Sequence, residues 1–230
     1  MRSILKTTLT IAVLCVLAAT LAHAQNLESV LASMDKAAAS FRTAQCDFVW
    51  DQYQKVVDDH DYQKGTMYFR RQGDDVQMAA DITSPAKKYL LFTGDLVSVY
   101  EPSINQVTEY NPGKNKADFQ SFLVLGFGGR GHDLEKSFDV KFAGMEQVQG
   151  VNAAKLELTP KSQRVKNLFQ TITLWIDPAL GVSVQQEFQE PVSGDYRLAK
   201  YTNIQLNQKI PSDVFKLKTT GHTKVIKPSG

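Results

Sequence analysis

The chain has 230 residues, a length that suits one medium-sized domain with a substantial hydrophobic core. Its 26 Lys and Arg residues against 24 Asp and Glu residues give a formal net charge of +2. Arg2 and Lys6 supply that excess and no long basic run is present, so bulk charge argues against nucleic acid and against an anionic membrane as partners.

The first 24 residues predict a cleaved secretory signal. A basic start is followed by residues 9–21, almost all apolar or small, and then by Ala22-His23-Ala24, the small-x-small pattern that signal peptidase accepts. This apolar stretch of about 13 residues is shorter than the ~20 that span a bilayer. We therefore expect a mature protein that starts at Gln25 in the periplasm, and an uncleaved anchor helix is the alternative. Cys15 does not make this a lipoprotein signal, because Leu14 precedes it and lipoprotein processing requires a small residue there.

Residues 26–43 predict an amphipathic helix. Its apolar side chains recur at three- and four-residue steps, which places them on one face, and Asn26 is a suitable N-cap. After Thr43 the period changes to two, as Cys46, Phe48 and Trp50 alternate with polar residues. Cys46 is the one cysteine left after cleavage, so no internal disulfide is possible, and its strand position suits a small apolar filler.

Short strands with turn signals about 8–12 residues apart continue along the chain and predict an antiparallel meander. A polar break at Asp58–Asp61 predicts the first hairpin tip, and residues 111–138 interrupt the meander with a helical candidate at 132–138. The expected fold is mainly β with an α lid (α+β), an incomplete antiparallel β-barrel or strongly curved sheet capped by helices, in one domain over residues 25–230. The expected later strands are 62–71, 76–80, 89–92, 96–100, 106–110, 140–145, 153–158, 169–176, 182–189, 196–204 and 215–217.

Two patterns resemble chemical motifs without their context. Gly126, Gly128 and Gly131 satisfy G-x-G-x-x-G, but the dinucleotide motif needs a long helix and a parallel strand after it, so a mobile glycine loop is the better interpretation. Asp58–Asp61 are adjacent on a turn and rarely converge on one metal ion. No nucleophile, zinc or phosphate motif is present, so we assign no catalytic, cofactor or metal residue, and the sequence favours a binding protein over an enzyme.

The strands carry many aromatic and methionine side chains on their apolar faces. A filled core is the simplest role for any one of them, but a sheet of about ten strands encloses more space than its own side chains fill. Methionine and aromatic residues suit a pocket for flexible acyl chains. The residues expected to line an acyl-chain pocket are Phe48, Trp50, Met67, Phe69, Met78 and Phe92, with Leu123 and Leu125 in the segment that covers it.

Seven motifs, in this order and spacing, resemble the LolA family of periplasmic carriers of outer-membrane lipoproteins and its wider superfamily. They cover nearly all of residues 25–230. The motifs are Gln45-Cys46-Asp47-Phe48, Gly65-Thr66-Met67-Tyr68-Phe69-Arg70-Arg71, Val99-Tyr100-Glu101-Pro102, Phe122-Leu123-Val124-Leu125, Leu156-Glu157-Leu158-Thr159-Pro160-Lys161, Leu174-Trp175-Ile176-Asp177 and Ile210-Pro211-Ser212-Asp213-Val214-Phe215.

The resemblance implies a monomeric carrier that shelters the acyl chains of lipoproteins in its interior. Such a carrier receives cargo from an inner-membrane ABC-type lipoprotein releasing complex and hands it to an outer-membrane acceptor lipoprotein. The superfamily also contains envelope-stress sensors and carriers of other lipids, so a lipid-sensing regulatory module and a carrier of another lipid remain alternatives.

The resemblance also implies a role for Arg71, since the matching arginine of the family ties the lid to the barrel through backbone carbonyls. Arg71 shares its alternation with Met67 and Phe69, which directs it toward the interior, although a strand end in water is the alternative. Gln72 replaces a family proline, so Arg70 is a partial substitute for Arg71. We further expect the glycine-rich segment 117–138 to be the most mobile part of the fold.

Overall fold

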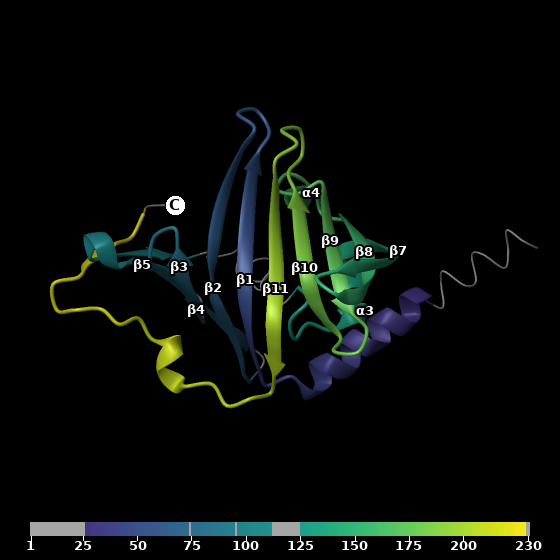
Figure 1. The fold of residues 1–230 in the computed structure, drawn as a ribbon, viewed down its shortest axis with the longest axis horizontal. Helices are drawn as coiled ribbons and strands as arrows, with labels where there is room; N and C mark the ends of the chain where they lie inside the picture. The colour runs from purple at the N-terminus through teal and green to yellow at the C-terminus, as the bar shows by residue number, and fades with distance from the viewer. Residues whose placement is uncertain (1–25, 74, 95, 112–124, 229–230) are drawn as a thin grey trace, which may run out of the picture.

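The computed structural model describes residues 26–73, 75–94, 96–111 and 125–228 (Figure 1). The predicted signal and Leu123 lie outside these residues. The strands are β1 (Thr43–Gln54), β2 (Asp59–Gln72), β3 (Asp75–Ser84), β4 (Lys88–Thr93), β5 (Leu96–Glu101), β6 (Gln106–Tyr110), β7 (Phe138–Val148), β8 (Val151–Pro160), β9 (Thr171–Asp177), β10 (Val182–Gln189), β11 (Tyr196–Leu206) and β12 (Lys224–Ile226). The helices are an N-terminal helix over residues 26–40, α3 (Gly131–Ser137), α4 (Gln163–Lys166), and the 3-10 helices η1 (Pro102–Ile104) and η3 (Ser212–Phe215).

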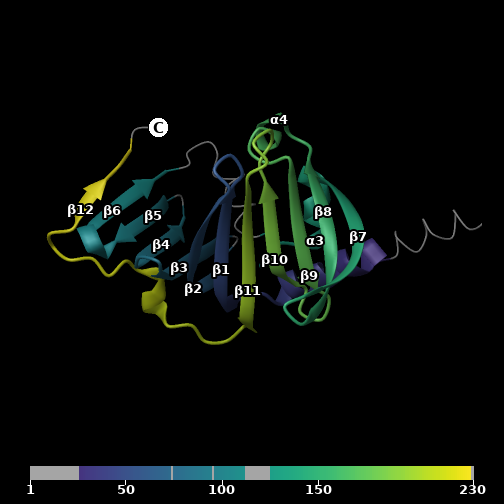
Figure 2. The same ribbon diagram turned by 45° about the horizontal axis from the view of Figure 1, so that its top comes forward.

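All these strands form one sheet in the order β12-β6-β5-β4-β3-β2-β1-β11-β10-β9-β8-β7. Neighbours are antiparallel except β12, which lies parallel to β6. The edge strands β12 and β7 do not pair with each other, so the sheet curves without closing (Figure 2). The expected fold class, an incomplete antiparallel barrel covered by helices, is confirmed. Within the described part of the chain, no helix combines the length and the apolar character needed to cross a membrane.

The pairing of β1 with β11 joins two meanders at the centre of the sheet. Strands β1 to β6 form one half and β7 to β11 the other. One apolar cluster crosses from the first half to Val182, Ala199 and Tyr201, and a second lies under the other half. The apolar stripe of the N-terminal helix, with Val30, Leu31 and Met34, covers the second half and packs on residues such as Leu156 and Leu174. Helix α3 lies beside it, so both helices cover the inner face of β7 to β10 (Figure 1).

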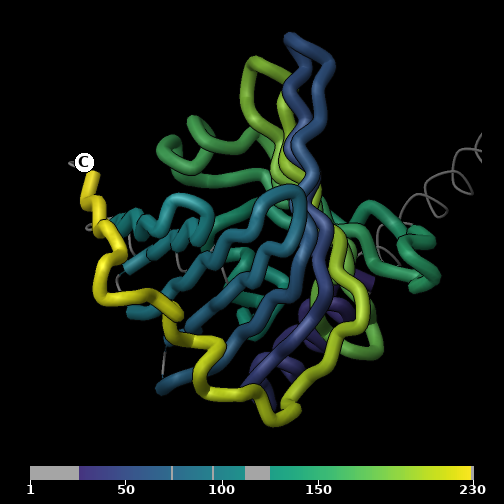
Figure 3. The backbone as a smooth tube through the Cα atoms, turned by 60° about the vertical axis from the view of Figure 1, so that its left-hand side comes forward, coloured from purple at the N-terminus to yellow at the C-terminus, as the bar shows by residue number. Residues whose placement is uncertain are grey.

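The C-terminal segment, residues 207–228, runs along the outer face of the first half and ends as β12 at its far edge (Figures 1 and 3). Phe215 of η3 packs on Ala79 and Leu91, and the Arg70 guanidinium carbon lies 4.2 Å from the centre of the Phe215 ring. The expected strand at 215–217 is therefore wrong. The apolar pattern there arises because Phe215, at the end of a short 3-10 helix, is buried against the sheet.

Several predicted boundaries also moved, and two of the shifts affect how the elements meet. The N-terminal helix ends at residue 40 rather than 43, because Thr43 already pairs with Arg70 in the sheet. The first hairpin turns at residues 55–58, and Asp59–Asp61 extend β2, where they pair with residues 52–54 of β1. Polar residues in this strand end reflect a hairpin that projects beyond the body of the sheet (Figure 3).

Candidate ligand-binding cavity

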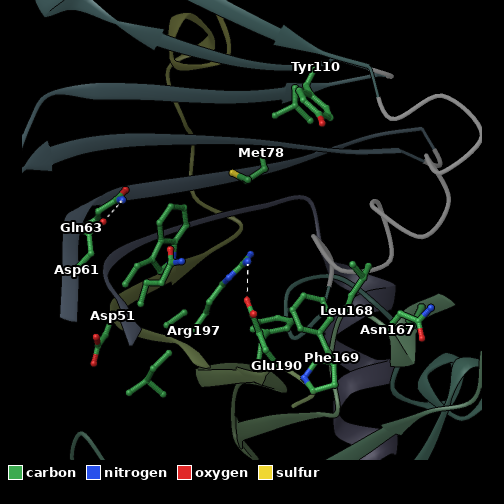
Figure 4. A pocket seen from close by; sticks show the side chains of 18 of the residues that line it. Asp51, Asp61, Gln63, Met78, Tyr110, Asn167, Leu168, Phe169, Glu190 and Arg197 are labelled. Atoms are coloured by element: carbon green, nitrogen blue, oxygen red, sulfur yellow. Dashed lines mark hydrogen bonds and ion pairs between the residues drawn. The ribbon is translucent and has the colours of Figure 1, made fainter. Parts of the chain in front are cut away.

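A cavity of about 970 Å³ lies on the inner face of the sheet (Figure 4). Its volume is at the upper end of the range for small-molecule sites, ~300–1,000 Å³. Its walls come from both halves of the sheet and from the α4 segment. The lining residues are Trp50, Asp51, Gln52, Asp61, Gln63, Met78, Val97, Tyr110, Arg164, Val165, Asn167, Leu168, Phe169, Phe188, Glu190, Pro191, Arg197, Leu198, Ala199 and Tyr201.

The cavity has an apolar buried end and a polar exposed end. Met78, Ala199 and Tyr201 are buried, and Phe169 and Phe188 add an aromatic pair with ring centres 5.2 Å apart. The exposed end carries ionic and amide groups, including Asp61, Gln63, Arg164, Asn167, Glu190 and Arg197, with an ion pair of 3.1 Å between Arg197 Nη2 and Glu190 Oε1 (Figure 4). A ligand with an apolar tail and a polar head matches this gradient.

Behind Tyr201, the aromatic ring of Phe127 fills the interior between the strands and the helices. The Phe127 ring stacks on Phe69 at 4.8 Å and meets Tyr201 edge-on at 5.0 Å. Phe127 is almost wholly buried, although it belongs to the loop of residues 125–130 that precedes α3. The loop therefore plugs the space that continues from the cavity toward the core.

Hydrogen bonds fix this loop on the sheet. The Gln186 side-chain amide donates to the Leu125 carbonyl, and the Gly126 carbonyl accepts from the Ser183 amide at 2.9 Å. The Tyr201 hydroxyl donates to Gln186 Oε1 at 3.2 Å, and burial raises the pKa of Tyr201 well above its ordinary range, so the hydroxyl keeps its proton. Each buried polar group of this chain of bonds thus has a partner.

The loop glycines allow close approach. A Cβ atom on Gly126 would lie 2.3 Å from Ser183 Cβ, and one on Gly128 would lie 2.7 Å from the Phe41 ring. Both glycines have φ near +80°, at 76° and 81°, a conformation that residues with a side chain rarely adopt. The two glycines thus allow the loop to pack closely on Ser183 and Phe41. The mobility expected of residues 117–138 stays a prediction.

Arg71 connects the loop and the end of the N-terminal helix to β2. Its Nη2 donates to the Gly128 carbonyl at 2.7 Å and its Nε donates to the Phe41 carbonyl at 3.3 Å. Arg70 points to the opposite face, where it donates to Gln77 Oε1. The suggestion that Arg70 substitutes for Arg71 is therefore wrong, because neighbouring residues of a strand face opposite sides.

The residues expected in the pocket occupy three places. Trp50 and Met78 line the cavity. Four others lie deeper in the same apolar cluster, namely Phe48, Met67, Phe69 and Phe92. Leu125 packs with the N-terminal helix.

Sequence reasoning missed the wall formed by α4 and the residues after it, including Leu168. The available signal was Ser162, an N-cap whose Oγ accepts from the Val165 amide at 3.3 Å. A helix of one turn has no periodicity by which it is recognised.

Comparisons with known proteins agree with this geometry. The family model described as outer membrane lipoprotein carrier protein LolA matches residues 39–218. No match was found among curated proteins. Among solved structures, an uncharacterized conserved protein from Thermus thermophilus has 11% identity and a TM-score of 0.55, over 87% of this chain and 98% of that one.

MucB has a similar fold. One MucB structure has 12% identity and a TM-score of 0.54, over 84% of this chain and 63% of that one. The MucA/MucB complex of Pseudomonas aeruginosa gives 15% identity and a TM-score of 0.50, over 84% and 61%. The chain thus spans about three fifths of the MucB chains that it matches. At these identities the likeness concerns the fold alone.

Proposed function

Since the chain belongs to the LolA family of outer-membrane lipoprotein carrier proteins, we propose that it is a periplasmic carrier that shelters lipoprotein acyl chains in its cavity. The observation that carries the proposal is the cavity of about 970 Å³ with an apolar buried end and a polar exposed end. Acyl chains would occupy the part near Met78 and Ala199, and the peptide of the lipoprotein would leave past the charged rim.

Physical chemistry explains why such cargo requires a carrier. Each methylene exposed to water costs about 0.8 kcal/mol, and a lipoprotein anchor carries dozens of them. The proposed route takes cargo from an inner-membrane ABC-type releasing complex to an outer-membrane acceptor lipoprotein. Delivery requires that the carrier hold its cargo less tightly than the acceptor does, and a cavity with one polar end meets this requirement better than a closed apolar one.

Trp50 offers a direct test because it lines the cavity, whereas the second tryptophan, Trp175, packs in a separate cluster. We expect a fatty acid with a brominated acyl chain to quench Trp50 fluorescence saturably in a Trp175→Phe variant. The same probe should leave the fluorescence of a Trp50→Phe variant unchanged. Quenching of Trp175 alone would place the acyl chain outside this cavity and contradict the proposal.

Ala199→Phe supplies the matching occlusion experiment. Ala199 lies on the buried part of the wall, so a phenyl ring there fills space that an acyl chain would occupy. We expect an affinity loss of at least about tenfold, equivalent to ~1.4 kcal/mol, or fewer than two unburied methylenes. Ala179→Phe, in an exposed turn, is the control. Equal affinities of both variants, with the thermal transition retained, would reject the cavity as the binding site.

A regulatory module that senses lipid is the second candidate, favoured by the similarity to MucB, for which a complex with MucA is known. The two functions differ in what happens to bound cargo. A carrier releases its acyl ligand to acceptor vesicles or to an acceptor protein, whereas a sensor retains it while binding a protein partner. Native mass spectrometry of the protein isolated from its own periplasm, before and after incubation with acceptor vesicles, separates the two.

A further inference from the structure

Two β-hairpins project beyond the body of the sheet, side by side (Figures 1 and 3). Three valines occupy their tips. Val56 and Val57, in the turn between β1 and β2, have exposed fractions of 89% and 64%, and Val192, between β10 and β11, has 103%. Aliphatic side chains gain no stability from exposure to water, so the packing of the described residues gives these valines no role.

Val192 is unfavourable in its backbone as well as in its exposure. Its φ is +76°, in the left-handed region, where a β-branched residue is an outlier. Gly194, two residues later, has nearly the same φ of +77° and shows the residue type that such a turn prefers. A valine that is both strained and fully exposed points to a role outside the fold.

Contacts behind the tips hold the two hairpins together as one unit. The Lys55 amide donates to Asp195 Oδ1 at 2.8 Å, from the first turn to the second hairpin. The rings of Tyr53 and Tyr196 are 5.0 Å apart, and the His60 ring lies 4.7 Å from that of Tyr53. The valine tips therefore keep a fixed spacing.

The chemistry of the two hairpins changes with distance from their tips. Valines come first. Behind them, the tyrosine rings of residues 53, 62 and 196 lie on the outer face of the strands, and Gln52, Asp61 and Arg197, at the same level, line the polar end of the cavity on the inner face. Tyrosines behind aliphatic side chains are the arrangement found at membrane–water interfaces. Convex tips enter a lipid layer easily but offer a protein or peptide no groove.

We propose that the valine tips insert into the interfacial layer of a zwitterionic phospholipid bilayer and place the cavity opening against it. Three carboxylates, those of Asp58, Asp59 and Asp195, stand at the tips against the one ammonium group of Lys55, so an anionic surface would repel the tips. Leu168, exposed on the opposite wall of the cavity, would face the same lipid layer. The purpose of this contact, direct passage of acyl chains into the cavity, rests on the proposed carrier function, whereas the contact itself does not.

Vesicle flotation of the protein purified after export tests the proposal. We expect wild type to float with phosphatidylcholine vesicles, less with vesicles rich in phosphatidylglycerol, and Val56→Ser/Val57→Ser to lose about tenfold in bound fraction. Val192→Gly should also weaken binding while raising thermal stability, because glycine relieves the strained φ. A variant that binds vesicles less but unfolds at a higher temperature is not misfolded, so misfolding cannot explain its weaker binding. Val225→Ser, at an exposed valine on β12, is the matched control and should bind as wild type does.

Each outcome decides the question. Unchanged flotation of the tip variants, or binding to anionic vesicles alone, overturns the proposal. Failure of wild type to bind either vesicle also overturns it and leaves a protein as the partner of the tips. The quenching of Trp50 by a dissolved brominated fatty acid is independent of vesicles, so it reports on the carrier function separately.

Discussion

Arg71 joins three parts of the chain that are distant in sequence. Its guanidinium on β2 reaches the Phe41 carbonyl at the end of the N-terminal helix and the Gly128 carbonyl in the loop. Its guanidinium carbon also lies 5.7 Å from the centre of the Phe41 ring. A planar group with several donors suits carbonyls that come from different directions. We propose that Arg71 is the latch that holds the loop closed until cargo displaces it.

Arg71→Leu should separate loading from release. Without the two bonds the loop opens more often, so amide exchange of residues 125–131 should accelerate, and acyl chains should still enter. Handover to the acceptor should slow, because the closed state no longer competes with cargo. Arg70→Leu is the control, since Arg70 faces the outer surface and contacts Gln77. If Arg71→Leu showed wild-type rates of amide exchange and cargo transfer, the proposed latch role of Arg71 would be rejected.

At the scale of elements, α3 is tied to the N-terminal helix by His132. Its Nδ1 lies 2.6 Å from Asp35 Oδ2 and its Nε2 lies 3.2 Å from Glu28 Oε2. The hydrogen bonds with Asp35 and then Glu28 raise the pKa of His132 above 6.5, against a smaller effect of burial. Burial acts to raise the pKa of Asp35, but its bonds with His132, aided by Arg130, lower it below 3.8.

The contact should stabilise the fold in a defined pH window. Because the folded-state pKa of His132 is raised, the contribution of the contact to the free energy of unfolding is complete below pH 6.5. It is lost as pH rises through the raised pKa. At the acid end it is lost as pH falls through the lowered pKa of Asp35. We expect His132→Gln to reduce the free energy of unfolding in urea more at about pH 5.5 than at about pH 8.5. His222→Gln, in an exposed turn, should show no such difference.

At the scale of the whole molecule, residues 207–228 form a strap that runs from the central strand β11 to β12 at the far edge of the sheet. Phe215 is its buried anchor, packed on Ala79 and Leu91. Phe215→Ala should lower the free energy of unfolding by about 3 kcal/mol, at the low end for this substitution because the strap can detach locally. Amides of residues 207–228 should exchange faster in this variant. Val225→Ala, on the exposed end of the strap, should have little effect, and equal losses in both would contradict an anchoring role.

The sequence predicts those features that depend on periodicity. The apolar stripe of residues 26–40 identified the helix, and the predicted bounds of β10 agree with the structure. Alternation also directed Met67, Phe69 and Arg71 to the same face, where the first two are buried and Arg71 meets the loop. Periodicity of two is a local property, so these inferences needed no knowledge of distant contacts.

Depth along a strand could not be predicted in this way. Phe48 and Trp50 share a face of β1, yet Phe48 is buried in the core and Trp50 lines the cavity. The difference arises from the register with β11, which places Phe48 opposite Tyr201 and Trp50 opposite Ala199. For the same reason the three-residue strand β12 was missed, since it exists only through its pairing with β6.

The central pairing of β1 with β11 also has a consequence for folding. It joins residues 43–54 to residues 196–206, so a chain synthesised from its N-terminus cannot form it until most of its length is present. Each half can fold early as a local meander, while the long loop closure delays the seam between them. Because the cavity is lined from both sides of that seam, it does not exist in a chain of which only one half has folded.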